Sequence, residues 1–422
     1  MGSLRSLTGI ACAAAVVGLS AAPEPVAAAP KTKASASLPS RLSTALRPAG
    51  RSSGAYVVNA TTGKTVFGSR QNSPRILASN TKLFTTTAAL AQYGVAAKLS
   101  TVVRGTGSLQ QNGTYRGSLY LVGGGDPTFG SSAFARRAYG GGASVQTLAQ
   151  RLKGIGIREV TGRIYGDEAK FDSLRGGPDS RYGVSPYVGP LSGLSYNRGL
   201  ATEGGRGYQV SPPAFAAARL DGALAQIGVP VAGTPRSGRV PAASVALVEV
   251  QSPPMSSLVR LTNKPSDNFF AEMLSKDLAL LANGPGTTKG GAKAAAGFAT
   301  RLGAAPASLT DGSGLSRGDR ASPFRVTRLL LAMRTRDEFP AFFNSLPIAG
   351  RDGTLGGRMR SGAARGRCRG KTGTLTGVTA LSGYCTALSG DVYAFSILMN
   401  GVNTSGGRAI QDRMAQLIAS TP

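Results

Sequence analysis

The chain has 422 residues, of which 48 are Lys or Arg and 20 are Asp or Glu, so its formal net charge is +28 at pH 7. Hydrophobic residues make up 41% of the chain, a globular composition, and at roughly 150 residues per domain the length predicts two or three units. The sequence contains no histidine, which excludes Ser-His-Asp and Cys-His catalysis, HExxH zinc sites and histidine proton shuttles. In an enzyme of this composition another group must move protons.

The N-terminus has the pattern of a secretory signal peptide. One Arg precedes a short apolar run and a stretch of small residues, so we expect residues 1–28 to be removed on export. The apolar run is too short to anchor the chain in a membrane. Lipid attachment at Cys12 is a weaker alternative, because the residues before it match a lipobox poorly. The Ala-, Pro-, Lys- and Ser-rich stretch 29–40 is expected to be a linker.

Cysteine content and charge indicate the surroundings of the mature chain. Removal of the signal leaves Cys368 and Cys385, an even pair in an exported protein, and we expect a disulfide between them. The positive charges are scattered rather than gathered in a basic block with aromatic residues. We therefore expect attraction to anionic wall polymers and the membrane surface, no nucleic-acid binding and no transmembrane helix in the mature chain.

The periodicity of apolar residues predicts elements along the whole chain. A strand–turn–strand pattern over 55–67 is typical of a β-hairpin, and a helix is expected over 79–94. Short alternating strands separated by Gly-rich turns follow over 99–245. The other predicted elements, in chain order, are helices near 145–155 and over 266–281, strands over 377–387 and 392–399, and a helix over 408–418.

This order predicts one α/β domain that is interrupted by another. We expect a catalytic domain made of residues 41–98 and 246–422. An inserted β-rich domain is expected over 99–245.

Three short motifs carry candidate chemistry, and the first is Ser79-Asn80-Thr81-Lys82. At the start of a helix, this spacing puts Ser79 and Lys82 on the same face, one turn apart. A serine hydroxyl needs a neighbouring base, and a lysine serves if burial or a second cation keeps its amine neutral. The N-terminal N–H groups of the helix would favour an oxyanion there.

The second motif is Ser266-Asp267-Asn268 at the mouth of the next predicted helix. A hydroxyl and an amide at this place could relay a proton and hold a substrate backbone. By itself, Ser266 is more simply explained as a helix cap. The rival match, Ser195 with Asn197, precedes a Gly-rich stretch without helical pattern, so we prefer Ser266 and Asn268.

The third motif is Lys371-Thr372-Gly373-Thr374, at the start of the C-terminal strands. Lys371 and the two hydroxyl groups could receive a carboxylate, and Gly373 lets a ligand backbone lie along the strand edge. Lys371 could also be the cation that keeps Lys82 neutral. Each motif is common alone, but their order along the chain is a specific signal.

With these motifs and four longer segments, the chain resembles the D-alanyl-D-alanine carboxypeptidase/endopeptidase family, the class C low-molecular-mass penicillin-binding proteins. The resemblance runs from about residue 50 to the C-terminus. The longer matching segments are 123–128, 190–197, 311–317 and 346–355.

The resemblance implies an α/β (α+β) fold: a penicillin-recognising domain of the DD-peptidase/β-lactamase type, with an antiparallel sheet flanked by helices and with inserted domains. The segment between the first two motifs is short for this family, so we expect its usual third domain to be trimmed or missing.

The resemblance also implies a role for each motif residue. Ser79 would be the acylated nucleophile and Lys82 its general base, while Ser266 and Asn268 would line the proton path and bind substrate. The remaining implied roles are a grip on the terminal carboxylate by Lys371 and Thr372, an oxyanion hole from the backbone N–H groups of Ser79 and Thr374, and a pocket for the diamino-acid side chain near Asp126 and Arg317. Asp126 is equally well explained as a turn residue.

The expected activity is that of a secreted, cell-wall-associated serine DD-peptidase that acts on peptidoglycan stem peptides. We expect this enzyme to need no metal and no cofactor. β-Lactam antibiotics would acylate Ser79 and be released slowly. Two alternatives stay open. A serine β-lactamase would use the same serine but turn penicillin over quickly, and a non-catalytic cationic cell-wall-binding protein would be unaffected by Ser79→Ala.

Overall fold

The computed structural model describes residues 9–15, 36–281 and 283–422. The predicted signal peptide and linker therefore lie largely outside the described residues. Ser37–Pro422 form one compact unit, to which the following description refers. Within the described residues, no helix has both the length and the apolar character needed to cross a bilayer.

The first sheet of this unit is antiparallel and has five strands in the order β12-β13-β14-β1-β2. β1 (Ser53–Asn59) and β2 (Thr65–Ser69) form the predicted hairpin, and β1 also pairs with β14 (Val392–Asn400). β12 (Cys368–Leu375) and β13 (Val378–Thr386) complete the sheet. Every residue of β1 is buried, because helices cover both faces of the sheet.

Two hydrophobic cores sit on the two faces of this sheet. On one face lie α1 (Leu38–Leu46) and α11 (Thr404–Ala419). On the other face lies α9 (Pro323–Met333), which joins a larger helical core. The other helices of that core are α2 (Thr81–Tyr93), α6 (Met255–Asn263), α7 (Asn268–Leu281), α8 (Thr288–Arg301) and α10 (Phe339–Ser345). The expected antiparallel sheet flanked by helices is confirmed.

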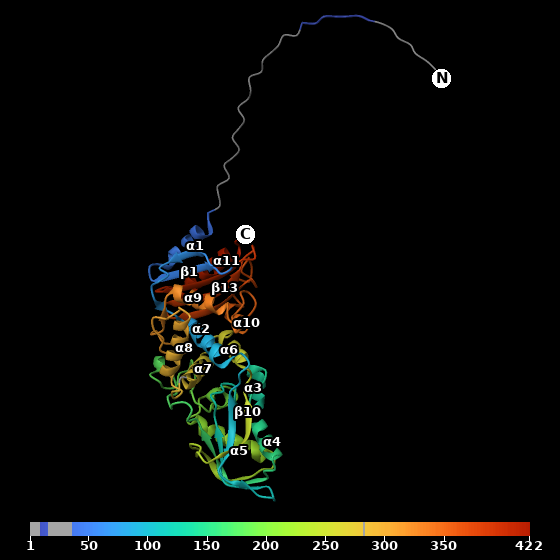
Figure 1. Ribbon diagram of the computed structural model, residues 1–422, viewed down its shortest axis with the longest axis vertical. Coiled ribbons are helices and arrows are strands. Elements are labelled where there is room, and N and C mark those ends of the chain that lie inside the picture. The colour runs from blue at the N-terminus through green and yellow to red at the C-terminus, as the bar shows by residue number, and fades with distance from the viewer. Residues whose placement is uncertain (1–8, 16–35, 282) are drawn as a thin grey trace, which may run out of the picture. The chain divides into compact units, whose positions relative to one another are not determined.

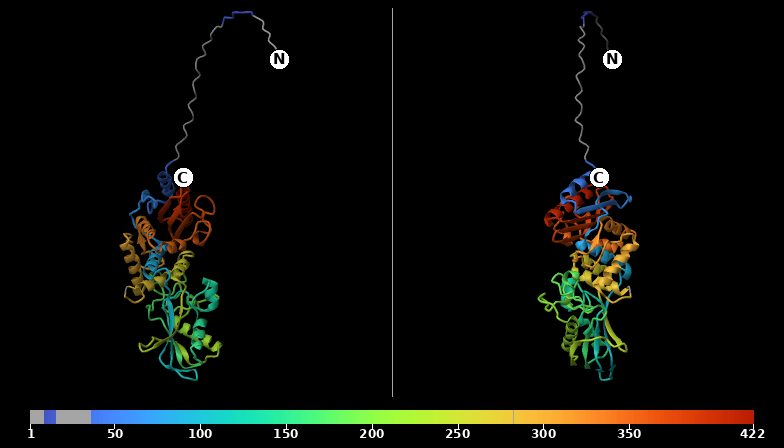
Figure 2. Two further views of the ribbon diagram at one scale, coloured as in Figure 1. Left: turned by 45° about the vertical axis from the view of Figure 1, so that its right-hand side comes forward. Right: turned by 90° about the vertical axis from the view of Figure 1, so that its left-hand side faces the viewer.

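The helices α2, α6 and α7 lie between the first sheet and a second sheet (Figures 1 and 2). β3 (Arg75–Ile76) and β11 (Arg320–Ala321) pair with each other as a separate, two-stranded antiparallel sheet. α2 is buried along most of its length. It is therefore a core helix, and its first turn is held in place from several sides.

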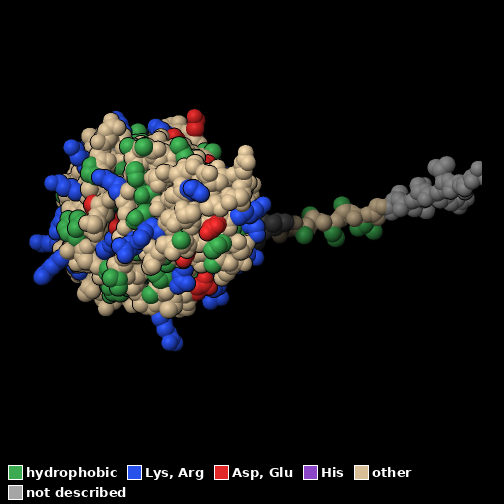
Figure 3. All heavy atoms as spheres, turned by 90° about the horizontal axis from the view of Figure 1, so that it is seen from below, with side chains coloured by type: hydrophobic (Ala, Val, Ile, Leu, Met, Phe, Trp, Pro, Cys, Tyr) green, Lys and Arg blue, Asp and Glu red, His purple; other side chains and the backbone are tan. Residues whose placement is uncertain are grey.

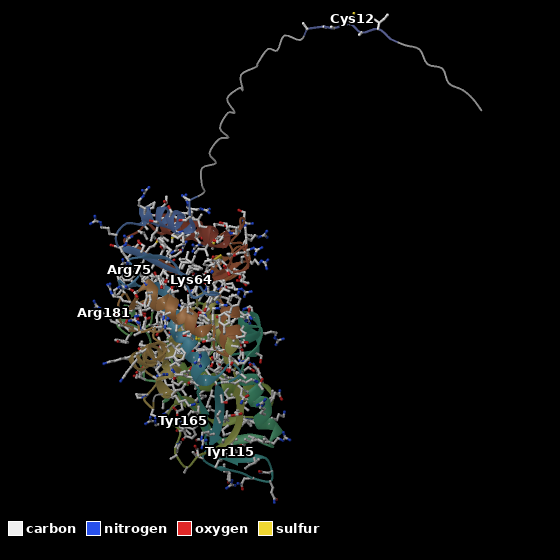
Figure 4. All side chains as sticks on the ribbon, turned by 45° about the horizontal axis from the view of Figure 1, so that its top comes forward. Cys12, Lys64, Arg75, Tyr115, Tyr165 and Arg181 are labelled. Carbon is white, nitrogen blue, oxygen red and sulfur yellow. A yellow bond between two sulfur atoms is a disulfide. The ribbon has the colours of Figure 1, made fainter. Side chains whose placement is uncertain are left out.

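The second sheet has seven strands and is mixed rather than purely antiparallel. The long strand β8 (Glu159–Asp167) runs parallel to its neighbours β6, β7 and β9. The other strands are β4 (Ser100–Gly105), β5 (Ser108–Leu109), β6 (Thr114–Arg116), β7 (Leu119–Val122), β9 (Val231–Ser237) and β10 (Val245–Gln251). Tyr115 and Tyr165 of this sheet lie toward the opposite end of the unit from Arg75 on β3 (Figure 4).

The segment 99–245 is less β-rich than its sequence indicates. It holds the expected helix, α4 (Val145–Gly154), and two that the periodicity did not predict, α3 (Ser132–Tyr139) and α5 (Pro212–Gln226). α5 begins with two prolines and is rich in Ala, so it lacks a clear polar face. α4 and α5 pack on one face of the second sheet around a core of their own. The division of the chain into domains at these boundaries stays a prediction.

The expected disulfide is confirmed. Cys368 and Cys385 face each other across β12 and β13, both are buried, and their sulfurs are bonded. The bond closes a short loop, with a sequence separation of 17 residues, and ties the strand that carries the third motif to its neighbour.

We expect the double change Cys368→Ala and Cys385→Ala to lower the free energy of unfolding by about 3 kcal/mol, since the open chain gains conformational freedom when it unfolds. Denaturant titration under oxidising conditions measures this difference. Adding a reductant provides the control, because it should destabilise the wild type and leave the double variant unchanged. Equal stability of the two oxidised proteins would contradict the prediction.

Candidate active site

An open cleft with a volume of about 1270 Å³ lies where the first sheet meets the helical core. The three sequence motifs meet in and behind this cleft. Its lining includes motif residues from all three: Ser79, Ser266, Asn268, Thr372, Gly373 and Thr374. The structure therefore brings together residues that are far apart in the chain.

Ser79 stands in a tight turn that leads directly into α2. The turn is a short 3-10 helix, Ala78–Asn80, and α2 begins at the next residue. Ala78 has a φ of +45°, a left-handed conformation unusual for a residue with a side chain. Gly314 fits tightly against this turn, since a Cβ at its position would lie 1.9 Å from the carbonyl oxygen of Ala78. Because the turn is the first of its helix, the N–H of Ser79 has no acceptor within the helix.

Lys82 is fully buried, and its Nζ has three close neighbours. It lies 3.0 Å from Ser79 Oγ, 2.7 Å from Asn268 Oδ1 and 2.7 Å from the carbonyl oxygen of Ser313. The amide and carbonyl oxygens can only accept hydrogen bonds, whereas the hydroxyl can also donate. A neutral amine that donates to the two acceptors therefore turns its lone pair toward the hydroxyl of Ser79.

Burial lowers the pKa of Lys82 to about 8. Nearby carboxyl groups act in the opposite direction and limit the fall, namely those of Asp311, Glu272, Asp267 and Asp319. An amine with this pKa exists in substantial amounts as both free base and ammonium near neutral pH. The residue can therefore accept a proton and give it up again.

Ser266 and Asn268 line the same cleft as Ser79. Ser266 has a φ of +63° and precedes α7. The helix is capped by the next residue instead, since Asp267 Oδ1 accepts the N–H of Phe270, so the interpretation of Ser266 as a helix cap is wrong. Asn268 binds Lys82 through its oxygen, and its Nδ2 donates to the carbonyl of Tyr187.

Lys371 lies behind Ser266 rather than in the open cleft. It is fully buried, and its Nζ donates to Ser266 Oγ (2.8 Å) and to the carbonyl oxygen of Thr372 (2.9 Å). Burial, together with the charge of Lys82, holds the pKa of Lys371 well below its usual range. This placement does not match the expected direct grip on a carboxylate. It does place a second amine near Lys82, where two ammonium charges disfavour each other.

Strand β12 is fixed against the turn that carries Ser79. Asn80 Nδ2 donates to the carbonyl oxygen of Lys371 at 3.0 Å. A Cβ at Gly373 would lie 2.9 Å from the carbonyl oxygen of Leu77 and 3.1 Å from the nitrogen of Ser79. The absence of a side chain at Gly373 therefore permits the close approach of this edge strand to the N-terminus of α2.

The structure does not bring Asp126 or the rival motif into the cleft. Asp126 is buried, and its Oδ1 accepts both the N–H and the hydroxyl of Thr128, as in an Asx turn. It is not among the residues that line the cleft, and its implied role beside the diamino-acid side chain stays a prediction. Ser195 and Asn197 are also buried and do not line the cleft, and Asn197 Oδ1 accepts the N–H of Ser131.

Arg317 does line the cleft, where its Nη2 donates to the carbonyl oxygen of Thr376. Sequence reasoning missed Arg408 of α11, which also lines the cleft and donates from Nη2 to Thr374 Oγ1 at 3.1 Å. Asp179 and Tyr187, from the segment 99–245, were missed as well. No motif marked these positions, because they come from loops and a helix end that only the fold brings to the cleft.

Comparison with known proteins places the chain in a family of carboxypeptidases. A model of the D-Ala-D-Ala carboxypeptidase 3 (S13) family matches residues 36–203 and 207–421. The chain is 31% identical to a D-alanyl-D-alanine carboxypeptidase from an Actinomadura species, over 88% of this chain and 81% of the relative.

Two solved structures show the same fold. Penicillin binding protein 4 (dacB) from Haemophilus influenzae superposes with a TM-score of 0.73 at 21% identity, over 89% of this chain and 97% of that chain. A complex of the same protein with a β-lactam superposes with a TM-score of 0.71 at 20% identity, over 89% and 98% of the two chains.

Proposed function

This chain belongs to the D-Ala-D-Ala carboxypeptidase 3 (S13) family, a family of serine-type carboxypeptidases, and from that premise we propose that it cleaves D-Ala-D-Ala stem peptides of peptidoglycan through an acyl-enzyme on Ser79. The observation that carries the proposal is the 3.0 Å contact between Lys82 Nζ and Ser79 Oγ, with the other two neighbours of the amine being acceptors only. A serine peptidase without histidine needs another base at this distance.

The reaction proceeds in two steps. Ser79 Oγ attacks the carbonyl carbon of the penultimate D-alanine while its proton moves to Lys82 Nζ. The C–N bond then breaks as the leaving amine takes up the proton that Lys82 accepted. This proton is relayed through the hydrogen-bonded side chains of Ser266 and Lys371, so D-alanine departs with a neutral amine and Lys82 is again a free base. Water hydrolyses the resulting ester and regenerates the hydroxyl. Cleavage of a cross-link is the same chemistry with a larger amine as leaving group.

The backbone N–H groups of Ser79 and Thr374 would receive the developing oxyanion. Support comes from the close approach of β12 to the first turn of α2 at Gly373. Arg408, rather than the buried Lys371, would supply the positive charge for the terminal carboxylate, with the hydroxyl groups of Thr372 and Thr374.

We expect Arg408→Ala to raise the KM for a D-Ala-D-Ala peptide by about tenfold, because a charge-assisted hydrogen bond contributes roughly 1.5–3 kcal/mol. Steady-state kinetics on a stem-peptide analogue provide the measurement. Arg408→Lys should recover part of the loss, since the charge is kept without the forked geometry. An unchanged KM in Arg408→Ala would contradict the assignment.

The chain would act outside the cytoplasm, where peptidoglycan lies, and the Cys368–Cys385 disulfide fits an oxidising location of this kind. Export by the predicted signal peptide fits this setting. Lys and Arg side chains are spread over the surface and are more frequent than Asp and Glu on the face shown in Figure 3. This charge would hold the protein near anionic wall polymers.

The test is labelling of the mature chain with a fluorescent penicillin, followed by mass spectrometry of the intact protein and its peptides. We expect one adduct, on Ser79, that is released slowly. Rapid loss of the label with turnover of penicillin would favour a β-lactamase instead. Failure to form any adduct would remove the enzymatic mechanism proposed for Ser79.

A further inference from the structure

Glu272 is a buried carboxyl group for which the chemistry described so far has no use. It lies on α7, one turn after Asn268, and is 1% exposed. Its Oε1 accepts the N–H groups of Gly312 (3.1 Å) and Ser313 (2.8 Å). Within the described part of the chain, its Oε2 is buried and has no hydrogen-bond partner. One oxygen thus fixes a loop, and the other is free to carry a proton.

The loop that Glu272 holds contacts the catalytic lysine. Glu272 binds the N–H of Ser313, and the carbonyl of this same residue accepts a hydrogen bond from Lys82 Nζ. That carbonyl is one of the two acceptors that leave the lone pair of Lys82 facing Ser79. The position of residue 313 therefore helps to set the direction of the lone pair.

The loop has little room to move independently of α7. A Cβ at Gly312 would lie 2.4 Å from Cβ of Ser275 on α7, and a Cβ at Gly314 would lie 1.9 Å from the carbonyl oxygen of Ala78. The hydroxyl of Thr85 on α2 donates to the carbonyl of Gly312. The segment 311–314 is thus packed between α7 and the turn of Ser79, and a shift on its α7 side would reach Lys82.

Glu272 also acts on Lys82 through charge. An ionised Glu272 would favour the ammonium form of Lys82. Burial, together with the nearby Asp311, raises the pKa of Glu272 to about 8, the same range as that of Lys82. The other charged groups that face these two residues are Asp267, Asp311 and Asp319 near Lys82, the amine of Lys371, and Lys276 near Glu272.

We propose that Glu272 is a positioning residue for acylation, which holds the Ser313 carbonyl against Lys82 and competes with Lys82 for a single proton. When Glu272 holds the proton, Lys82 is the free base and can deprotonate Ser79. When Lys82 holds it, the two form an unreactive pair of opposite charges. The inference rests on the proposed function of Lys82 as the general base.

The test compares Glu272→Gln and Glu272→Ala in the full mature chain, with the acylation rate by benzylpenicillin measured against pH. Glutamine keeps an acceptor for the loop but cannot ionise. We expect its plateau rate to stay within a few-fold of the wild type and its midpoint to fall by about one pH unit or more. Alanine offers no acceptor and releases the loop, so we expect the plateau acylation rate of the Glu272→Ala variant to fall by about 100-fold.

Asp277→Asn is the matched control, because Asp277 is another fully buried acid on the same helix and lies against Gly125 rather than Lys82. This substitution should leave the midpoint of the pH profile unchanged. The inference is overturned if the Glu272→Gln profile superimposes on that of the wild type, or if glutamine and alanine lower the plateau equally. Wild-type protein that is never acylated would instead overturn the proposed function, and the inference with it.

Discussion

Replacing Ser79 by alanine is expected to reduce peptide hydrolysis to the background rate, a loss on the order of 10⁶-fold, and to abolish the penicillin adduct. The size of this loss follows from the removal of the nucleophile, because the rest of the site can then only bind the substrate and stabilise the developing oxyanion. Ser79 is the serine that Lys82 Nζ contacts. Single-turnover kinetics and intact-mass spectrometry measure both effects.

Ser195→Ala provides the control for this substitution. Ser195 belongs to the rival Ser-x-Asn match, is buried, and lacks a hydrogen-bond partner for its hydroxyl in the described structure. We expect its loss to leave both hydrolysis and labelling unchanged. An adduct that persists in Ser79→Ala would show that another residue is the nucleophile.

Replacing Lys82 by methionine is expected to lower the acylation rate by about 10³- to 10⁴-fold, at the upper end of what general bases contribute. Methionine fills much of the buried space of the lysine stem but cannot accept a proton. It also leaves Asn268 Oδ1 and the Ser313 carbonyl without their donor, so thermal unfolding must accompany the kinetics. The substitution of Lys64, which is exposed, by methionine should leave the rate unchanged.

The pH dependence of acylation separates the chemical role of Lys82 from a packing role. Burial lowers its pKa to about 8, so below this pH the amine is increasingly charged and has no lone pair for Ser79. The wild-type rate should therefore rise with pH, reach half its maximum at about 8 and level off about one pH unit higher. In Lys82→Met this rise should disappear. A variant that keeps the wild-type profile at a reduced rate would assign the titration to another group.

Much of the fold and of the site could be predicted from local patterns. A Ser and a Lys three residues apart at a helix start must share a face, and the structure places them 3.0 Å apart. The hairpin 55–67 and the C-terminal strands follow from short runs rich in apolar and β-branched residues that are bounded by turn residues. The Cys368–Cys385 disulfide follows from cysteine arithmetic, since the third cysteine, Cys12, lies in the predicted signal peptide.

The parts that escaped prediction depend on contacts between distant segments. The Ser313 carbonyl reaches Lys82 only because Gly312 and Gly314 let the loop pack closely against α7 and the turn of Ser79. Arg408 reaches Thr374 from the last helix, which the sequence alone could not orient. The sequence predicts that the amine of Lys371 lies in the cleft, but the fold buries it behind Ser266.

The mechanism depends on Lys82 becoming a neutral amine near physiological pH, and a titration of this side chain measures that property itself. In a chain with ¹³C-labelled lysines, the Cε signal of Lys82 is identified by its absence from Lys82→Met and followed by NMR against pH. We predict a midpoint at about 8. A midpoint at about 10.4, the value of an ordinary lysine, would show that Lys82 is an ammonium at neutral pH and cannot be the base.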